Sequence, residues 1–310
     1  MDEDVWAGLC PFQSVSFIQR FLKQCYGKKG IEKAEAKSYR NSYPFLYYLQ
    51  HGEAHYKLAH SAHATMQPLL LFYGMSQLVK ACLLSTDPEY PRTTSVLAHG
   101  VSTRKKKKKD YAFVEDEVMI QKHGLAAHLS KELFGLTDLE GKKYAMNPLF
   151  ERIPDLNDLI GDLYGQKPFL DIEVTNNALK IPSGILDDLN MTVPRLIDFL
   201  SDRMNLSILS FAESMGSLIL FIEYWPSQFP FSLGGQLSLP RKRDDYDGLP
   251  ELLVHFLLLY NLSMIARYET EWWSELFHQA TDDLPLIDKF LAVSKKKVPL
   301  LISRYLRNLM

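Results

Sequence analysis

Cysteine is scarce in this sequence, with 3 among 310 residues. Cys10, Cys25 and Cys82 are widely spaced, and no two of them form a CxxC pair. Structural zinc sites take their ligands from closely spaced pairs, and disulfide frameworks need an even number of cysteines. We therefore expect reduced thiols in the core of a cytoplasmic protein.

Long apolar runs and targeting signals are also lacking. The longest apolar stretch, residues 252–266, is interrupted by His255 and Asn261, whereas a membrane span needs about 20 apolar residues. The acidic start, MDED, has neither the basic residues nor the apolar run of a secretory signal. The sequence predicts a cytoplasmic protein without membrane contact.

Recognisable catalytic motifs are missing as well. The sequence contains no GxGxxG, no P-loop ending in GK[ST] and no GxSxG nucleophile elbow. We therefore expect no cofactor. The leading hypothesis is a non-catalytic helical scaffold or interaction protein, acting as a homodimer.

Charge is nearly balanced over the whole chain, with a net of −2, but it is segregated along it. Residues 1–110 carry 16 Lys and Arg against 9 Asp and Glu, and residues 289–310 carry 6 basic residues and no acidic one. The intervening residues 111–288 carry 13 basic against 28 acidic residues. Two interpretations stay open: the basic regions face a polyanion, or they attract the acidic middle within or between chains.

Apolar spacing predicts helices on both sides of a mixed region. Residues 68–84 and 250–267 are apolar around most of the helix, so we expect both to be buried, most simply against each other. Short segments near 117–121, 169–174, 178–181 and 208–225 predict strands. We expect a predominantly helical α+β fold with an N-terminal helical part (1–110), an α+β insert with a small antiparallel sheet (111–240) and C-terminal helices (241–310) that pack on the N-terminal part.

One proline and two glycines affect the predicted course of the first helices. Pro44 is typical of a first helical turn, so we expect a new helix to begin there. Gly52 is expected to interrupt the helix that follows. Gly74, in contrast, is small enough to allow a close helix crossing.

Three stretches of the sequence resemble the YaaC-like bacterial protein family. They are PLLLFYGMSQLVKACLL (68–84), LAHGVSTRKKKKK (97–109) and ARYETEWW (266–273). Their order and spacing resemble that family over nearly the whole chain, which implies a protein of Bacillus-type bacteria. The first and third stretches also resemble, more distantly, helices of HEPN-type domains, whose members include RNA-cleaving toxins and nucleotidyltransferase partners. This second resemblance implies a HEPN-like helical bundle.

Active HEPN ribonucleases carry an Arg, four to six further residues and a His, usually across a dimer interface. The one match here is Arg92 with His99, and composition alone gives roughly one chance match. This pair lies in a predicted loop rather than on the late helix, where Arg267 has no His at that spacing. Arg92 and His99 are the candidate catalytic residues of the alternative hypothesis, a HEPN-like nucleic-acid-associated protein or ribonuclease.

A basic run gives the candidate anion-binding segment. Like charges keep such a run extended and solvated unless an anion binds it. Arg267 joins these candidates because it can bind an anionic ligand; its alternatives are to cap helix carbonyls or to stack on Trp272. The candidates for nucleic acid or another polyanion are Arg104, Lys105, Lys106, Lys107, Lys108, Lys109 and Arg267.

Four of the nine histidines fall within thirteen residues. The segment HGEAH differs from the zinc motif HExxH, and its Glu is expected on the opposite helix face from the two His. The interpretations are a metal site or polar histidines at the surface and core edge. The metal-site candidates are His51, His55, His60 and His63.

Overall fold

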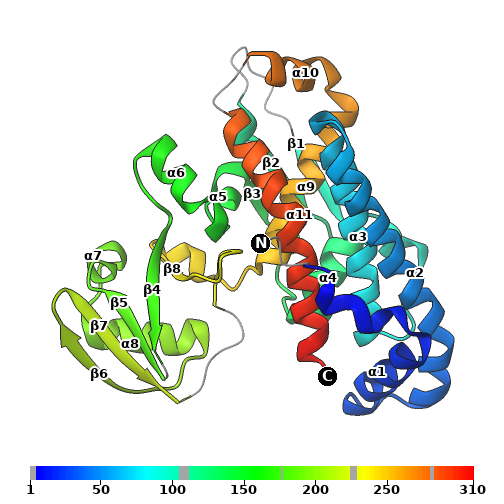
Figure 1. Cartoon of the computed structure of the whole chain (residues 1–310), viewed down its shortest axis with the longest axis horizontal. Coiled ribbons are helices and arrows are strands. Elements are labelled where there is room, and N and C mark those ends of the chain that lie inside the picture. Colours follow the sequence, from blue (N-terminus) through cyan, green and yellow to red (C-terminus); the bar gives the residue numbers. More distant parts are fainter. Residues whose placement is uncertain (1–4, 105–111, 176, 224–228, 280–282) are drawn as a thin grey trace. The chain divides into compact units, whose positions relative to one another are not determined.

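The computed structural model describes residues 5–104, 112–175, 177–223, 229–279 and 283–310. It forms two compact units, residues 1–147 with 255–310 and residues 148–254. The fold is predominantly helical α+β, as predicted (Figure 1). The HEPN-like arrangement of the helices stays a prediction.

The first unit consists mainly of helices. Their bounds are η1 (Ala7–Gln13), α1 (Val15–Lys28), α2 (Ala34–Ser61), η2 (Ala64–Met66), α3 (Gln67–Thr86), η3 (Thr94–Leu97), η4 (Phe113–Glu115), α4 (Leu125–Phe134), α9 (Glu251–Tyr268), α10 (Thr270–Gln279) and α11 (Asp283–Asn308). An antiparallel sheet completes the unit, in the order β1 (Val101–Arg104), β2 (Glu117–Ile120) and β3 (Lys143–Ala145).

Strand register explains where the first unit ends. Val101 pairs with Ile120, and Glu117 pairs with Ala145. The chain up to residue 147 therefore folds with the N-terminal helices. The sequence placed boundaries at 110/111 and 240/241, whereas the compact units divide at 147/148 and 254/255. The composition of a short strand does not show which strand it pairs with, so the sequence alone does not locate this boundary.

The two strongly apolar helices contact each other, as predicted. The Phe72 ring of α3 lies 5.3 Å from the Phe256 ring and 5.5 Å from the Tyr260 ring of α9. Residues 64–86 are long and apolar enough to cross a membrane by length and composition, but 72% of the tested window is buried inside the protein. This burial is typical of a core helix.

Helix α2 runs unbroken through Pro44 and Gly52, so both predicted interruptions are wrong. Pro44 is exposed, and burial of Phe45, Leu46 and Leu49 beside it offsets the lost helical hydrogen bond. Gly52 and Gly74 lie where α2 and α3 cross. A Cβ on Gly52 would lie 2.5 Å from Leu78 Cδ2, and one on Gly74 would lie 2.8 Å from Tyr56 Cδ2. The close crossing predicted from Gly74 is confirmed.

The second unit carries a five-stranded antiparallel sheet. Its order is β6 (Ile208–Ser214), β7 (Ser217–Ile222), β5 (Ala178–Pro182), β4 (Phe169–Thr175) and β8 (Leu237–Pro240). The remaining elements are α5 (Met146–Phe150), η5 (Pro154–Leu156), α6 (Asn157–Tyr164), α7 (Ile185–Leu189), α8 (Val193–Met204) and η6 (Arg243–Tyr246). One face of the sheet packs in a core with Leu189, Leu196 and Leu200.

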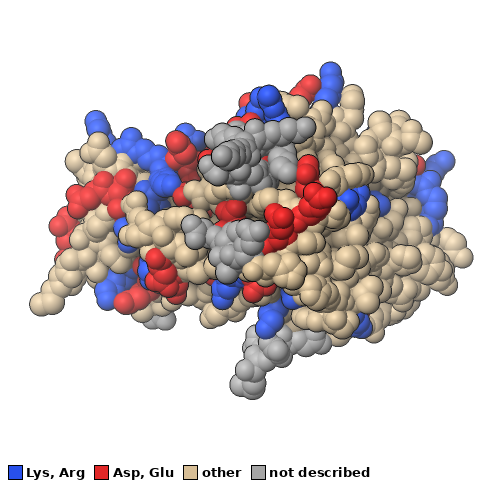
Figure 2. Space-filling model, turned by 90° about the horizontal axis from the view of Figure 1, so that it is seen from above, with Lys and Arg blue, Asp and Glu red and all other residues tan. Residues whose placement is uncertain are grey.

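Figure 2 shows basic and acidic side chains interspersed on one face of the protein. Lys37 and Arg40 pair with Glu89 in the first unit, with N–O distances of 3.4 and 3.0 Å. In the second unit, Arg152 pairs with Asp247 at 2.7 Å. These ion pairs form within the basic region and within the acidic region, so they leave the net charge of each region unchanged.

The glycine crossing predicts opposite effects for two Gly→Ala substitutions. Gly74→Ala should lower the free energy of unfolding by about 1–2 kcal/mol, because the new methyl group has no room beside the buried Tyr56 ring. Gly27→Ala in α1, where a Cβ meets nothing within 4 Å, should be neutral or stabilising by up to about 1 kcal/mol. Urea unfolding measures both, and equal effects at the two positions would contradict the close crossing.

Candidate functional site

Arg92 and His99 have different partners in the structure. Arg92 Nη2 and Nε donate to Asp87 Oδ1 at 3.0 and 3.3 Å. The His99 ring instead lies 4.8 Å from the Phe72 ring and 5.9 Å from the Tyr260 ring. Within the described chain, no hydrogen bond or ring contact joins Arg92 to His99.

Two glycines fix the backbone beside His99. Gly100 and Gly124 have φ angles of 73° and 119°, in the region that favours glycine. A Cβ on Gly124 would collide with the Gly100 backbone. This close approach lets the first amides of α4, those of Leu125 and Ala126, donate to the carbonyls of residues 98 and 99 at 2.7 and 3.0 Å. The start of α4 thereby holds His99 against α3.

Arg267 lies in the last turn of α9. Its Nε donates to the Ser263 carbonyl at 3.1 Å, which is the helix-capping role considered from the sequence. Its Nη1 donates to the Tyr73 hydroxyl at 3.3 Å. The guanidinium lies 5.2 Å from the Tyr268 ring, so its aromatic partner is Tyr268 rather than Trp272.

These contacts define a group that we call the His99 cluster: His99, Arg267, Lys80, Tyr73 and Tyr260. Burial lowers the pKa of His99, and the positive charges of Arg267 and Lys80 lower it further. Burial also lowers the pKa of Lys80, whose Nζ lies 5.8 Å from the Tyr48 ring. The cluster therefore combines two cations with an imidazole that is held neutral.

Neither cation of the His99 cluster has a carboxylate within ion-pair distance among the residues that the structure describes. Arg267 donates to a carbonyl, a hydroxyl and the Met264 sulfur. Lys80 lies over an aromatic ring. Both positive charges act on His99 and disfavour its protonated form, and such effects are stronger at a half-buried site because the surrounding dielectric is lower. The arrangement is chemically suited to an anion that would offset these positive charges.

Strand β1 runs from this cluster toward the basic run. The Thr103 hydroxyl donates to Asn261 Oδ1, and Asn261 Nδ2 donates to Asp116 Oδ2 at 3.3 Å. This network fixes β1 to α9 beside Tyr260. Arg104 ends the strand and is exposed; Lys105 to Lys109 lie outside the described residues.

The four clustered histidines lie on α2 and at its end. His55 Nδ1 donates to the His51 carbonyl at 2.7 Å, and His63 Nδ1 lies 2.9 Å from the Thr65 hydroxyl. His60 is exposed. Within the described ranges, no three His, Cys, Asp or Glu residues are grouped so as to hold a metal ion.

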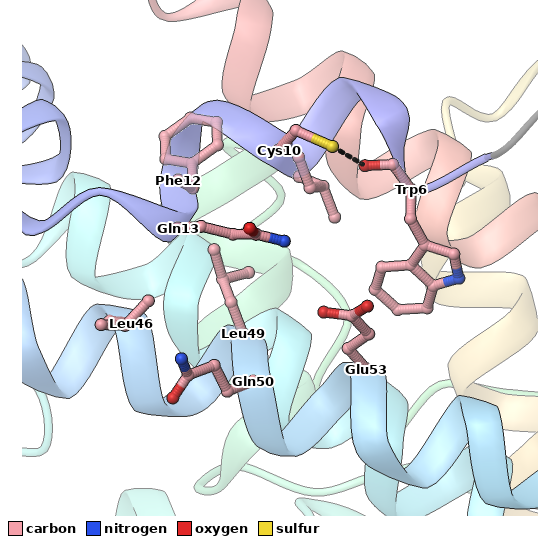
Figure 3. A pocket seen from close by; sticks show the side chains of 9 residues that line it. Trp6, Cys10, Phe12, Gln13, Leu46, Leu49, Gln50 and Glu53 are labelled. Carbon is pink, nitrogen blue, oxygen red and sulfur yellow. Dashed lines mark hydrogen bonds between the residues drawn. The ribbon is translucent and has the colours of Figure 1, made fainter.

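A small cavity lies between η1 and α2 (Figure 3). Its volume is about 90 Å³, and Trp6, Leu9, Cys10, Phe12, Gln13, Leu46, Leu49, Gln50 and Glu53 line it. The Cys10 thiol donates to the Trp6 carbonyl, and Glu53 pairs with Lys57 at 2.6 Å. An engineered cavity of about 150 Å³ holds benzene, so this one suits only a smaller group. None of the sequence-predicted site residues lines it.

Sequence reasoning missed Lys80 and Tyr73. Both lie within the apolar stretch 68–84. Lys80 is the one charged residue of that stretch, and a charge on a helix expected to be buried was the available signal.

Asp87 forms a second polar centre, at the end of α3. Its carboxyl lies 3.3 Å from His128 Nε2 as well as contacting Arg92, and its side chain is 3% exposed. Burial raises the pKa of this carboxyl, but the nearby His128 and hydrogen bonds from Arg92 and the Glu89 amide outweigh burial and hold the pKa at about 2.

The low pKa of Asp87 predicts an acid-sensitive contribution to stability. The folded-state pKa lies below the ordinary 3.8, so the stabilisation is present above pH 4 and is lost as pH falls toward 2. Asp87→Asn should lower the free energy of unfolding at pH 7 by about 2 kcal/mol and flatten the stability profile between pH 4 and 2.

Urea unfolding across that pH range measures the effect. Asp138→Asn is the matched control, because Asp138 is fully exposed. An acid profile of Asp87→Asn that equals the wild-type profile would contradict the ionised, hydrogen-bonded state.

Comparison with known proteins gives one match. The family model described as YaaC-like Protein matches residues 10–306. No curated protein and no solved structure matches the chain. The family match spans nearly all 310 residues, including α3, the basic run and α9. The chain therefore belongs to the YaaC-like family.

Proposed function

We propose that this protein is a helical interaction protein whose ligand is a polyanion, such as a nucleic acid. One observation carries the proposal: Arg267 and Lys80 are half-buried, lack a described carboxylate partner and flank a neutral His99. A phosphate group bound beside His99 would offset both positive charges and accept hydrogen bonds from Arg267 and Lys80.

The basic run extends the proposed site. Arg104 ends β1, the strand anchored beside Tyr260 by Thr103 and Asn261. The five lysines that follow in sequence contribute charges that would contact successive phosphates of a chain-like ligand. A single small anion would need only the His99 cluster, so the run favours an extended ligand.

Catalysis by a ribonuclease is the second candidate function, and the state of His99 favours it. A neutral imidazole beside a guanidinium can take a proton from a ribose hydroxyl while the cation stabilises developing charge. Since Arg92 is bound to Asp87, Arg267 is the better candidate than Arg92 for the cationic partner.

The proposal predicts that Arg267→Gln and Lys80→Gln each weaken binding of a labelled single-stranded RNA about tenfold, as loss of one charge-assisted contact implies. Replacing Lys105 to Lys109 with Ser should weaken binding further and flatten its salt dependence, by about 0.7 in log–log slope per lost contact. Fluorescence anisotropy across a range of salt concentrations measures both.

Arg203→Gln is the matched control, because Arg203 is exposed beside Asp202 in the second unit. Absence of wild-type binding to RNA and heparin at low salt would refute the polyanion proposal. Gel analysis of the same mixtures tests the second candidate: cleavage that His99→Ala abolishes supports a ribonuclease, and intact RNA contradicts one.

A further inference from the structure

Strand β6 is the outermost strand of the five-stranded sheet (Figure 1). It pairs with β7 on one side, and within the described residues no backbone group pairs with its other side. The strand spans seven residues, Ile208–Ser214, with a register irregularity between Ile208 and Ser210. Its regular part therefore presents a free hydrogen-bonding edge.

The turn into β7 determines which groups face that edge. Met215 and Gly216 have φ angles of 35° and 74° and join Ser214 to Ser217 as a two-residue hairpin. Ser214 and Ser217 are then a hydrogen-bonded pair, and such pairs alternate along the ladder. The amides and carbonyls of Ala212 face β7, whereas those of Phe211 and Glu213 face outward.

The opposite edge of the same sheet is covered. Strand β8 has four residues and ends at Pro240. The segment before it folds back, with a bridge between Phe231 and Leu237 and a hydrogen bond from the Ser238 amide to the Pro230 carbonyl. Edge strands that must not associate are usually short, covered or marked by Lys and Pro. Within the described residues, β6 is neither short nor covered and carries no Lys or Pro, and its irregularity is confined to Ile208–Ser210.

Apolar side chains along β6 are also exposed. Leu209 is 66% exposed and Phe211 is 47% exposed. Phe211 lies opposite Leu220, which lies opposite Leu179, and both leucines are fully buried in the core. Neighbours across strands share a face, so this apolar row runs across the sheet and stops at Phe211.

We propose that β6 is a self-association surface, on which β6 of a second copy of this chain adds an antiparallel strand centred on Phe211. In that register the two Phe211 rings continue the apolar row. Glu213, the one charged residue of β6, lies opposite Leu209 of the partner subunit, so no like charges face each other. The two-fold pairing uses the same edge on both copies and leaves neither β6 edge open.

Strand β6 can pair with a copy of itself because Phe211, where the apolar row stops, also lies on the free edge. This favours a second copy of the chain over an unrelated peptide. Strand β6 would be the interface of the homodimer expected from the sequence. This interface is independent of the proposed polyanion ligand, since β6 lies in the second unit and the His99 cluster in the first.

Light scattering over a concentration series and backbone amide exchange test the surface together. The wild type should dimerise, and the amides of Phe211 and Glu213 should be protected although neither has a partner within the chain. Phe211→Lys should raise the dimer dissociation constant at least tenfold. Val174→Lys, at the other end of the same row and 41% exposed, should leave it unchanged.

Two results would overturn the proposal. One is a wild-type protein that stays monomeric at the concentrations used for NMR. The other is a dimer in which the Phe211 and Glu213 amides exchange as fast as unpaired loop amides, because that dimer would use another surface. The exchange readout needs only the wild type, so it decides the question even if Phe211→Lys fails to fold.

Discussion

The packing of Phe72 between α3 and α9 is the contact on which the candidate site depends. The Phe72 ring is fully buried and contacts Phe256 and Tyr260 on α9 as well as His99. Two helices too apolar to face water gain most from covering each other. That burial draws together residues far apart in sequence: it sets Tyr73 of α3 beside Arg267 of α9, with Lys80 near enough to affect the charge of His99.

Electrostatics then gives this junction its chemical character. Burial removes water from around His99 and Lys80, so charge on either side chain is disfavoured. The fold adds no described carboxylate to compensate, although it does so elsewhere: the half-buried Arg152 and Arg241 are both paired with aspartates. Arg267 instead donates to a carbonyl, a hydroxyl and a sulfur, so a bound anion would give it the counter-charge that those two arginines have within the fold.

Much of the fold could be predicted from the sequence, because helix periodicity and strand alternation are local signals. Residues 68–84 and 251–267 are helical as expected, and these two apolar helices meet. The helix boundaries predicted at Pro44 and Gly52 were wrong, because tertiary packing outweighs the local preferences of these two residues. Of the candidate site, the sequence predicted His99 and Arg267 as functional residues. It did not predict their proximity, which arises from long-range packing. Lys80 was missed because it lies within an apolar run.

The central claim is that the His99 cluster is an anion site, and the pH titration of the His99 ring by NMR tests it most directly. Without added anion, the midpoint should lie below the ordinary value of 6.5. Inorganic phosphate at low salt should raise that midpoint, because a bound anion compensates the charges of Arg267 and Lys80 and favours the imidazolium form. A midpoint that phosphate leaves unchanged, in a protein that remains folded, would contradict the account.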